Sequence, residues 1–155
     1  MNIYNLQTTT YMTISIEQAW DFFSLASNLE KITPKELDFR IIAKPDVPRI
    51  FSGMRIQYKV RPLLNIAVKW ETEIGEVDAP FKFMDKQLKG PYALWEHTHL
   101  CEEVPGGVKM TDVVSYALPL GWLGMLMHNI VVKKKLEEIF TYREKVVKDL
   151  FGEYK

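Results

Sequence analysis

Two stretches of alternating residues on either side of Pro105-Gly106 constrain the fold of this chain more than any other feature. Side chains of a strand point alternately to opposite faces, so each stretch divides into an inward and an outward set. In the first stretch the even positions carry the charge, which places the odd positions inward. The inward sets are Trp95, His97, His99 and Cys101 on the first strand, and Val108, Met110, Asp112, Val114, Tyr116 and Leu118 on the second.

A hairpin turning at Pro105-Gly106 brings the two inward sets face to face in a single register. His99 then lies opposite Asp112, His97 opposite Val114, Trp95 opposite Tyr116 and Cys101 opposite Met110. A slip of one residue would turn one inward set outward, so the two patterns support the same pairing. The sequence therefore predicts two histidines and an acid on an otherwise apolar sheet face.

Length and composition limit the class of protein. The chain has 155 residues, and we expect one domain over 1–155. Twenty basic residues balance twenty acidic ones, which argues against a nucleic-acid partner. A single cysteine, Cys101, and the lack of a signal-peptide pattern at the start favour a reducing, cytoplasmic location. The most hydrophobic run, 118–132, is interrupted by Pro119 and polar residues and is too short to span a bilayer.

The remaining pattern predicts an α+β protein. Ser15, with Gln18 at the capping-box position, starts a short helix over 16–23, and a second short helix follows over 28–32. A turn over 61–65 separates two of the strands. From Leu123 onward apolar residues recur at helical spacing and predict one long C-terminal helix. We expect about seven antiparallel strands wrapped around that helix; the strands outside the hairpin are expected at 1–13, 37–44, 54–61, 66–77 and 81–88.

In this order of elements the chain resembles the START and birch-pollen-allergen-like superfamily, also called SRPBCC or helix-grip proteins. More narrowly it is similar to bacterial ligand-binding members of the polyketide cyclase/dehydrase-like branch. The resemblance implies a helix-grip fold with an elongated apolar cavity under the helix; relatives include lipid carriers, quinone- and hormone-binding proteins and aromatic cyclases. It rests on Phe83-x-Asp85-x-Gln87-x-x-Gly90-Pro91-Tyr92-x-x-Trp95-x-His97-x-His99, on Thr111-Asp112-x-Val114-x-Tyr116-x-Leu118-Pro119 and on Ile139-Phe140-x-Tyr142-Arg143.

The inward polar residues admit three interpretations. A three-residue turn over Gly90-Pro91-Tyr92 would set Asp85 opposite His97, and Gln87 opposite Trp95. The cluster is then a hydrogen-bonded network that fixes strand register, since buried charges need partners. It could instead orient the polar group of a ligand, or His-x-His with a carboxylate could bind zinc or iron. We expect no metal and no cofactor.

Three further features bear on a cavity. Arg143 falls on the apolar stripe of the helix, where its stem could cover apolar surface while the guanidinium reaches the rim. It could instead face a ligand or pair with Glu76, Asp85 or Asp112. Four aromatic residues with polar tips share the inward face, which suggests some water or ligand beneath them. The segment Leu120–Met127 is either a gate or a hinge, and an exposed Trp122 there would indicate membrane or partner contact. The inward aromatic residues are Tyr58, Trp70, Trp95 and Tyr116.

The sequence favours non-covalent binding of a hydrophobic or amphipathic small molecule: a lipid, a quinone or an aromatic, polyketide-like compound. We expect no nucleic-acid partner and no stable membrane insertion. The alternative is a cyclase or dehydratase with His97 or His99 as general acid/base and Tyr116 or Arg143 polarising a carbonyl. A structural interaction module would instead have a filled core. The expected ligand-binding residues are Tyr58, Trp70, Gln87, Trp95, His97, His99, Asp112, Tyr116, Phe140 and Arg143.

Overall fold

The computed structural model describes residues 1–62 and 65–152, so part of the predicted 61–65 turn lies outside the described residues. The first helix begins where the capping box predicts, because Ser15 Oγ accepts from the Gln18 amide and Gln18 Oε1 accepts from the Ser15 amide. The elements are β1 (Tyr4–Met12), α1 (Ile16–Phe23), η1 (Ala26–Leu29), η2 (Lys35–Leu37), β2 (Arg40–Ala43), β3 (Arg55–Val60), β4 (Val68–Asp78), β5 (Lys82–Lys89), β6 (Leu94–Val104), β7 (Gly107–Ala117), α2 (Gly121–Met127), η3 (His128–Val132) and α3 (Lys133–Phe151).

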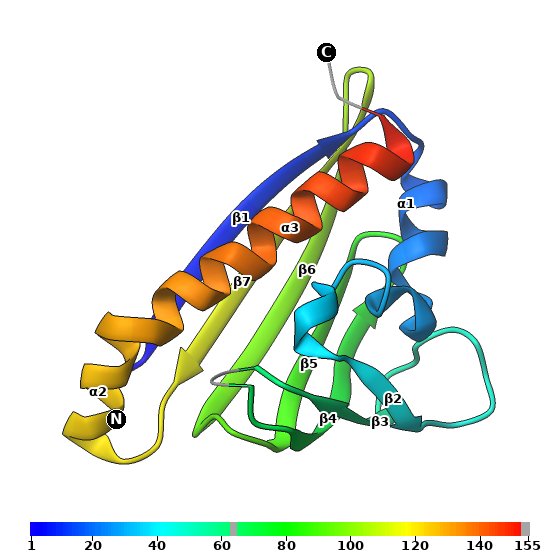
Figure 1. Cartoon of the computed structure of the whole chain (residues 1–155). Coiled ribbons are helices and arrows are strands. Elements are labelled where there is room, and N and C mark those ends of the chain that lie inside the picture. Colours follow the sequence, from blue (N-terminus) through cyan, green and yellow to red (C-terminus); the bar gives the residue numbers. More distant parts are fainter. Residues whose placement is uncertain (63–64, 153–155) are drawn as a thin grey trace.

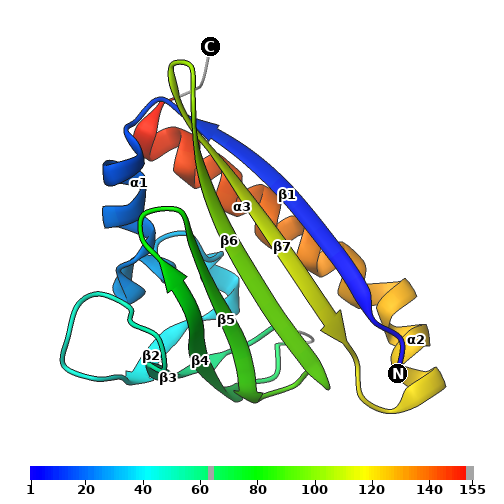
Figure 2. The ribbon, with the colours of Figure 1, turned by 180° about the vertical axis from the view of Figure 1, so that it is seen from behind.

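All seven strands form one antiparallel sheet in the order β1-β7-β6-β5-β4-β3-β2 (Figures 1 and 2). Strands β2 to β7 follow each other in sequence order, and β1 joins the free edge of β7. Gly107 allows that close approach, because a Cβ there would clash with the Met12 carbonyl. The α+β helix-grip expectation is therefore confirmed, with α3 lying across one face of the sheet.

Three local expectations need correction. The second short helix is a 3₁₀ turn that begins at Ala26 rather than Asn28, and another 3₁₀ turn, η2, precedes the strand expected from Leu37. That strand begins only at Arg40. The C-terminal helix starts at Gly121 and passes through a π-helical turn, η3, before α3 continues. Short turns and π-helical turns depend on tertiary packing, which apolar periodicity does not report.

The buried apolar side chains among the described residues form three clusters, two of which lie on either side of a polar stretch, while the third holds Ile56 of β3 and Ile74 of β4. Met110 and Cys101 belong to the cluster near α1, together with Val147 of α3. Val114 belongs to the other cluster, together with Phe140 of α3. The histidines of β6 and the acid of β7 lie between these clusters, beneath the helix. The fold thus places a charged group in the middle of its own core.

Candidate functional site

Five ionisable side chains from four elements meet between the sheet and α3, and we refer to them as the polar cluster. Its members are Asp85 of β5, His97 and His99 of β6, Asp112 of β7 and Arg143 of α3. All are buried except Asp85, which is partly buried. The predicted backbone register is confirmed, with His99 opposite Asp112 and Asp85 opposite His97.

The side chains, however, pair along the diagonals of that register. Asp112 Oδ1 lies 2.7 Å from His97 Nε2, and Asp85 Oδ2 lies 2.8 Å from His99 Nε2. The directly opposed pairs are longer, at 3.3 Å for His99 Nδ1 to Asp112 Oδ1 and 4.0 Å for His97 Nδ1 to Asp85 Oδ2. Diagonal neighbours on a sheet lie within reach of long side chains. The two histidines exchange the partners that the register alone assigns to them.

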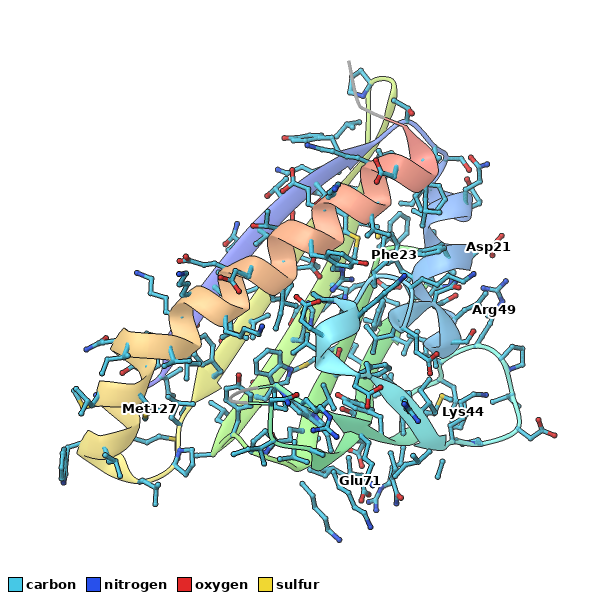
Figure 3. The ribbon with its side chains drawn as sticks, in the orientation of Figure 1. Asp21, Phe23, Lys44, Arg49, Glu71 and Met127 are labelled. Carbon is cyan, nitrogen blue, oxygen red and sulfur yellow. The ribbon has the colours of Figure 1, made fainter. Side chains whose placement is uncertain are left out.

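Arg143 completes the surroundings of Asp112. Its Nη1 lies 3.5 Å from Asp112 Oδ1, so one carboxylate oxygen faces three nitrogens. Of the three acids proposed from the sequence as partners, the structure pairs Arg143 with Asp112; Glu76 instead pairs with Lys82. The guanidinium carbon also lies 5.6 Å from the ring centre of Phe23, which α1 directs toward α3 (Figure 3).

Charge within the polar cluster balances when one histidine is protonated. Burial acts to raise the pKa of Asp112, but Arg143 and the two histidines hold that pKa well below its usual range. Burial also acts to raise the pKa of Asp85, and the His99 hydrogen bond keeps it below normal. Burial lowers the pKa of His97, with the His99 charge adding to the effect. Burial acts to lower the pKa of His99 too, yet its contacts with Asp112 and Asp85 raise it.

These directions give His97 and His99 different roles. Two carboxylates balance Arg143 and one imidazolium, and the opposite directions of the two histidine pKa shifts favour His99 as the protonated ring and His97 as the neutral one. The His97 proton is on Nε2, because that nitrogen donates to Asp112, and Nδ1 then carries a lone pair. His99 also stacks between His97, at 3.7 Å, and the Phe83 ring, at 4.0 Å. The stack fixes both imidazole rings in orientation.

The polar cluster forms part of the wall of two adjoining cavities. The larger has a volume of about 150 Å³ and is lined on its sheet side by Trp70, Trp95 and His97, and on its helix side by Phe140. The smaller has a volume of about 70 Å³ and extends toward α1, where Phe22 and Phe23 line it. Both cavities are lined by Phe39, Tyr58, Asp85, His99 and Arg143. The cavity walls are thus mainly apolar and aromatic, with one charged patch and a few uncharged polar side chains, among them Asn28 and Thr72.

The cavities include most of the residues expected from the sequence. Tyr58, Trp70, Trp95, His97, His99, Phe140 and Arg143 line the larger one. Gln87, Asp112 and Tyr116 are not among the described residues that line either cavity. Gln87 hydrogen-bonds the backbone of Tyr92 through both ends of its amide, and Asp112 lies behind the histidines. Tyr116 donates to or accepts from His128 Nε2 at 2.8 Å and lines a separate hollow of about 200 Å³.

Other lining residues were missing from the sequence-based set. Tyr92 packs against both Trp70 and Trp95, with ring centres 5.5 and 4.9 Å apart. Phe39 packs on Tyr58 from the segment before β2. Asp85 and Phe83 lie two residues apart on β5 and point to the same inward face, so the alternation of that strand could have predicted Asp85 as a site residue. Tyr92 lies in the turn between β5 and β6, where no alternation applies, and Phe39 precedes β2 although the sequence predicted a strand over 37–44.

Among the described residues, Asp85, His97 and His99 are the group that could hold a metal ion, with one ligand atom of each within 4.8 Å of the others. The two rings, however, are stacked with only 22° between their planes. Their in-plane lone pairs therefore do not converge on a common point, and the closest pair of ligand atoms already shares a proton. The arrangement suits a hydrogen-bonded network better than a metal centre.

No known family profile and no curated protein matches this sequence. Solved structures do match over nearly the whole chain. Ara h 8.0201, a birch-pollen-allergen-like protein, is 14% identical with a TM-score of 0.58, covering 96% of this chain and 99% of its own. Ms6760 from Mycobacterium smegmatis is 14% identical with a TM-score of 0.65, covering 97% and 98%.

The di-domain ARO/CYC protein BexL of the BE-7585A biosynthetic pathway is also similar in structure. It is 14% identical with a TM-score of 0.72, and the match covers 99% of this chain and 51% of BexL. Identities this low establish the fold alone. The chain therefore has the helix-grip fold of the birch-pollen-allergen-like proteins, as its sequence motifs implied.

Proposed function

We propose that this protein binds a compact, mainly apolar small molecule in the two adjoining cavities and contacts its polar group through the polar cluster. The observation that carries the proposal is that His99, Asp85 and Arg143 form a charged patch in walls that are otherwise mainly aromatic and aliphatic. Ligand sites are typically apolar, with a few convergent polar groups that fix orientation.

Cavity volume narrows the class of ligand. Pockets for drug-sized molecules typically span ~300–1,000 Å³, whereas an apolar cavity of ~150 Å³ accommodates a molecule the size of benzene. The larger cavity matches the second size. Of the lipid, quinone and aromatic ligands considered from the sequence, a single-ring aromatic or quinone head group fits this space better than a long acyl chain.

Native mass spectrometry of freshly purified protein tests the proposal. We expect a co-purifying small molecule, or one acquired from a panel of single-ring phenols, quinones and aromatic acids. The substitution Ile139→Phe enlarges a side chain that lines the larger cavity and should weaken binding by about fivefold or more, since overpacking costs ~1–3 kcal/mol. Ile130→Phe is the matched control, because Ile130 is 63% exposed on η3. Binding that survives Ile139→Phe unchanged would overturn the assignment.

A second function, acid/base catalysis on an aromatic or polyketide-like substrate, is favoured by one observation. Asp112 orients His97 through Nε2, so the neutral ring presents Nδ1 as a base beside the larger cavity. Arg143 lines the same cavity and could polarise a carbonyl. Under this proposal His97→Gln abolishes turnover of the bound compound, while binding is weakened far less because His99, Asp85 and Arg143 still line the cavity. Unchanged product formation by the variant would remove His97 from the reaction.

A further inference from the structure

The beginning of the C-terminal helical segment exposes large apolar side chains at one end of the molecule. The run 118–132 contains no Asp, Glu, Lys or Arg. Trp122 is 77% exposed, Leu120 74% and Ile130 63%. We refer to the exposed set as the apolar tip, and its members are Leu120, Trp122, Leu123, Met125, Leu126 and Ile130. Monomeric soluble proteins rarely expose such contiguous apolar groups unless something binds there.

The side chains of the apolar tip are exposed although the helical segment that carries them packs closely on the rest of the protein. Gly124, His128 and Val132 recur every fourth residue and are buried against the rest of the protein. A Cβ at Gly124 would clash with the Pro119 carbonyl, so α2 packs closely on the preceding turn. His128 accepts or donates a 2.8 Å hydrogen bond with Tyr116 and stacks on Tyr4 at 3.5 Å. The inner face is anchored, and the apolar tip is therefore held outward.

The N-terminal residues extend the apolar tip. Met1 is 84% exposed and Ile3 55%. Met1, Trp122 and Met125 line an open groove of about 440 Å³ between the start of β1 and α2. In Figure 1 α2 and the N-terminus lie together at the end of the molecule opposite the β6–β7 turn, and Met127 marks this end in Figure 3.

Positive charge directly follows the apolar tip. Lys133, Lys134 and Lys135 begin α3, and the first two are exposed. Within residues 1–62 and 65–152, no ion pair joins Lys133 or Lys134 to an acid. An uncharged helical face with a protruding tryptophan, bordered by lysines, is typical of a segment that lies in the interface of an anionic membrane. No helix among the described residues is long and apolar enough to cross a membrane.

We propose that the apolar tip docks the protein reversibly on anionic lipid bilayers, with Trp122 and its neighbours entering the head-group region and Lys133 and Lys134 facing the acidic lipids. Tryptophan prefers this depth because its ring is apolar and its N–H remains near water. The lysines supply attraction that acts within a Debye length of the surface. The proposal is independent of what occupies the interior cavities.

Co-flotation of the full chain with phosphatidylcholine vesicles, with and without phosphatidylserine, tests the proposal. We expect binding that requires phosphatidylserine, falls as salt rises and is accompanied by a blue shift of Trp122 fluorescence. Trp122→Ser with Leu126→Ser should abolish binding. Lys133→Gln with Lys134→Gln should weaken it by about fivefold for each charge removed.

Matched controls separate the tip from the rest of the surface. Phe81→Ser removes a side chain that is 50% exposed in the β4–β5 turn, and Lys31→Gln with Lys145→Gln removes two exposed lysines elsewhere. Both controls should bind vesicles like the unchanged protein. Equal binding with and without phosphatidylserine, or a dimer in sedimentation that Trp122→Ser with Leu126→Ser dissociates, would overturn the proposal; the latter assigns the tip to a second copy of this chain.

Discussion

Charged residues usually lie at the surface of a protein and large apolar residues in its interior. The polar cluster and the apolar tip depart from this rule in opposite ways. The cluster places five ionisable groups in the core, four of them buried and Asp85 partly buried, whereas the tip exposes six large apolar ones. Inside, each charge has a partner within the protein, and the two signs balance. Outside, the apolar groups have no cover among the described residues. Buried charge is satisfied internally, while the exposed apolar surface depends on a partner from outside the chain.

Removing the central carboxylate should have the largest effect on stability. Asp112→Asn leaves Arg143 and a protonated His99 facing one remaining carboxylate, and breaking a buried charge pair costs ~3–5 kcal/mol. We expect a loss of that size in the free energy of unfolding, measured in urea. Asp149→Asn, on the exposed side of α3, should change it by less than ~0.5 kcal/mol. Equal effects of the two variants would show that the cluster is not a balanced network.

The coupling between Asp112 and Arg143 is the next effect in size. Arg143→Met removes the charge while keeping a long apolar side chain over Phe23 and Phe140. The double variant should lose less stability than the sum of the single variants, by a coupling energy of ~0.5–3 kcal/mol. A double-mutant cycle in urea measures this difference. Strict additivity would mean that the 3.5 Å contact contributes nothing.

The pH dependence of stability should distinguish His99 from a neutral residue. The folded protein raises the pKa of His99, so its stabilisation is fully present below the ordinary value of ~6.5 and is lost as pH rises through the folded pKa. The advantage of the unchanged protein over His99→Gln should therefore be largest at acidic pH and shrink above neutrality. Urea unfolding at several pH values checks this. If the difference in unfolding free energy between the unchanged protein and His99→Gln instead grew with pH, the proton would belong to another group.

The smallest effect on stability belongs to the tip. Trp122 is 77% exposed, so Trp122→Ser should change the free energy of unfolding by no more than ~0.5 kcal/mol while reducing vesicle binding. Thermal melting and co-flotation of the same sample measure both quantities. Large destabilisation by Trp122→Ser would show that the tryptophan packs on the protein and would remove the contrast with the polar cluster.

Alternation was sufficient to predict the sheet around the site. The turn at Pro105-Gly106 and the pairing of His99 with Asp112 follow from period-two patterns on two strands, since a slip would have exposed an apolar set. The position of Asp85 opposite His97 followed from the same reasoning across a less regular turn. Burial of Arg143 on the apolar stripe of α3 followed from helical spacing. Periodicity therefore determined which residues face the interior.

The alternation of residues did not predict how the side chains pair within that interior. The register places His99 opposite Asp112, but rotamers let each imidazole reach the diagonal acid instead. Tyr116 points inward as expected, yet the π-helical turn brings His128 to its hydroxyl rather than leaving it at the larger cavity. The side-chain amide of Gln87 forms two hydrogen bonds with the backbone of Tyr92. Each outcome depends on rotamers and hydrogen bonds, which the alternation of residues along the sequence does not report.

The π-helical turn between α2 and α3 has a consequence for orientation. A π turn closes its hydrogen bonds over one more residue than an α turn does, so His128–Val132 holds one residue more in its turn than an α-helix would. If the same residues closed as a regular α-helix, that extra residue would rotate α2 by about 100° relative to α3. Trp122 would then point in another direction while α3 kept its contacts with the sheet. The π turn therefore sets the direction in which the exposed indole points.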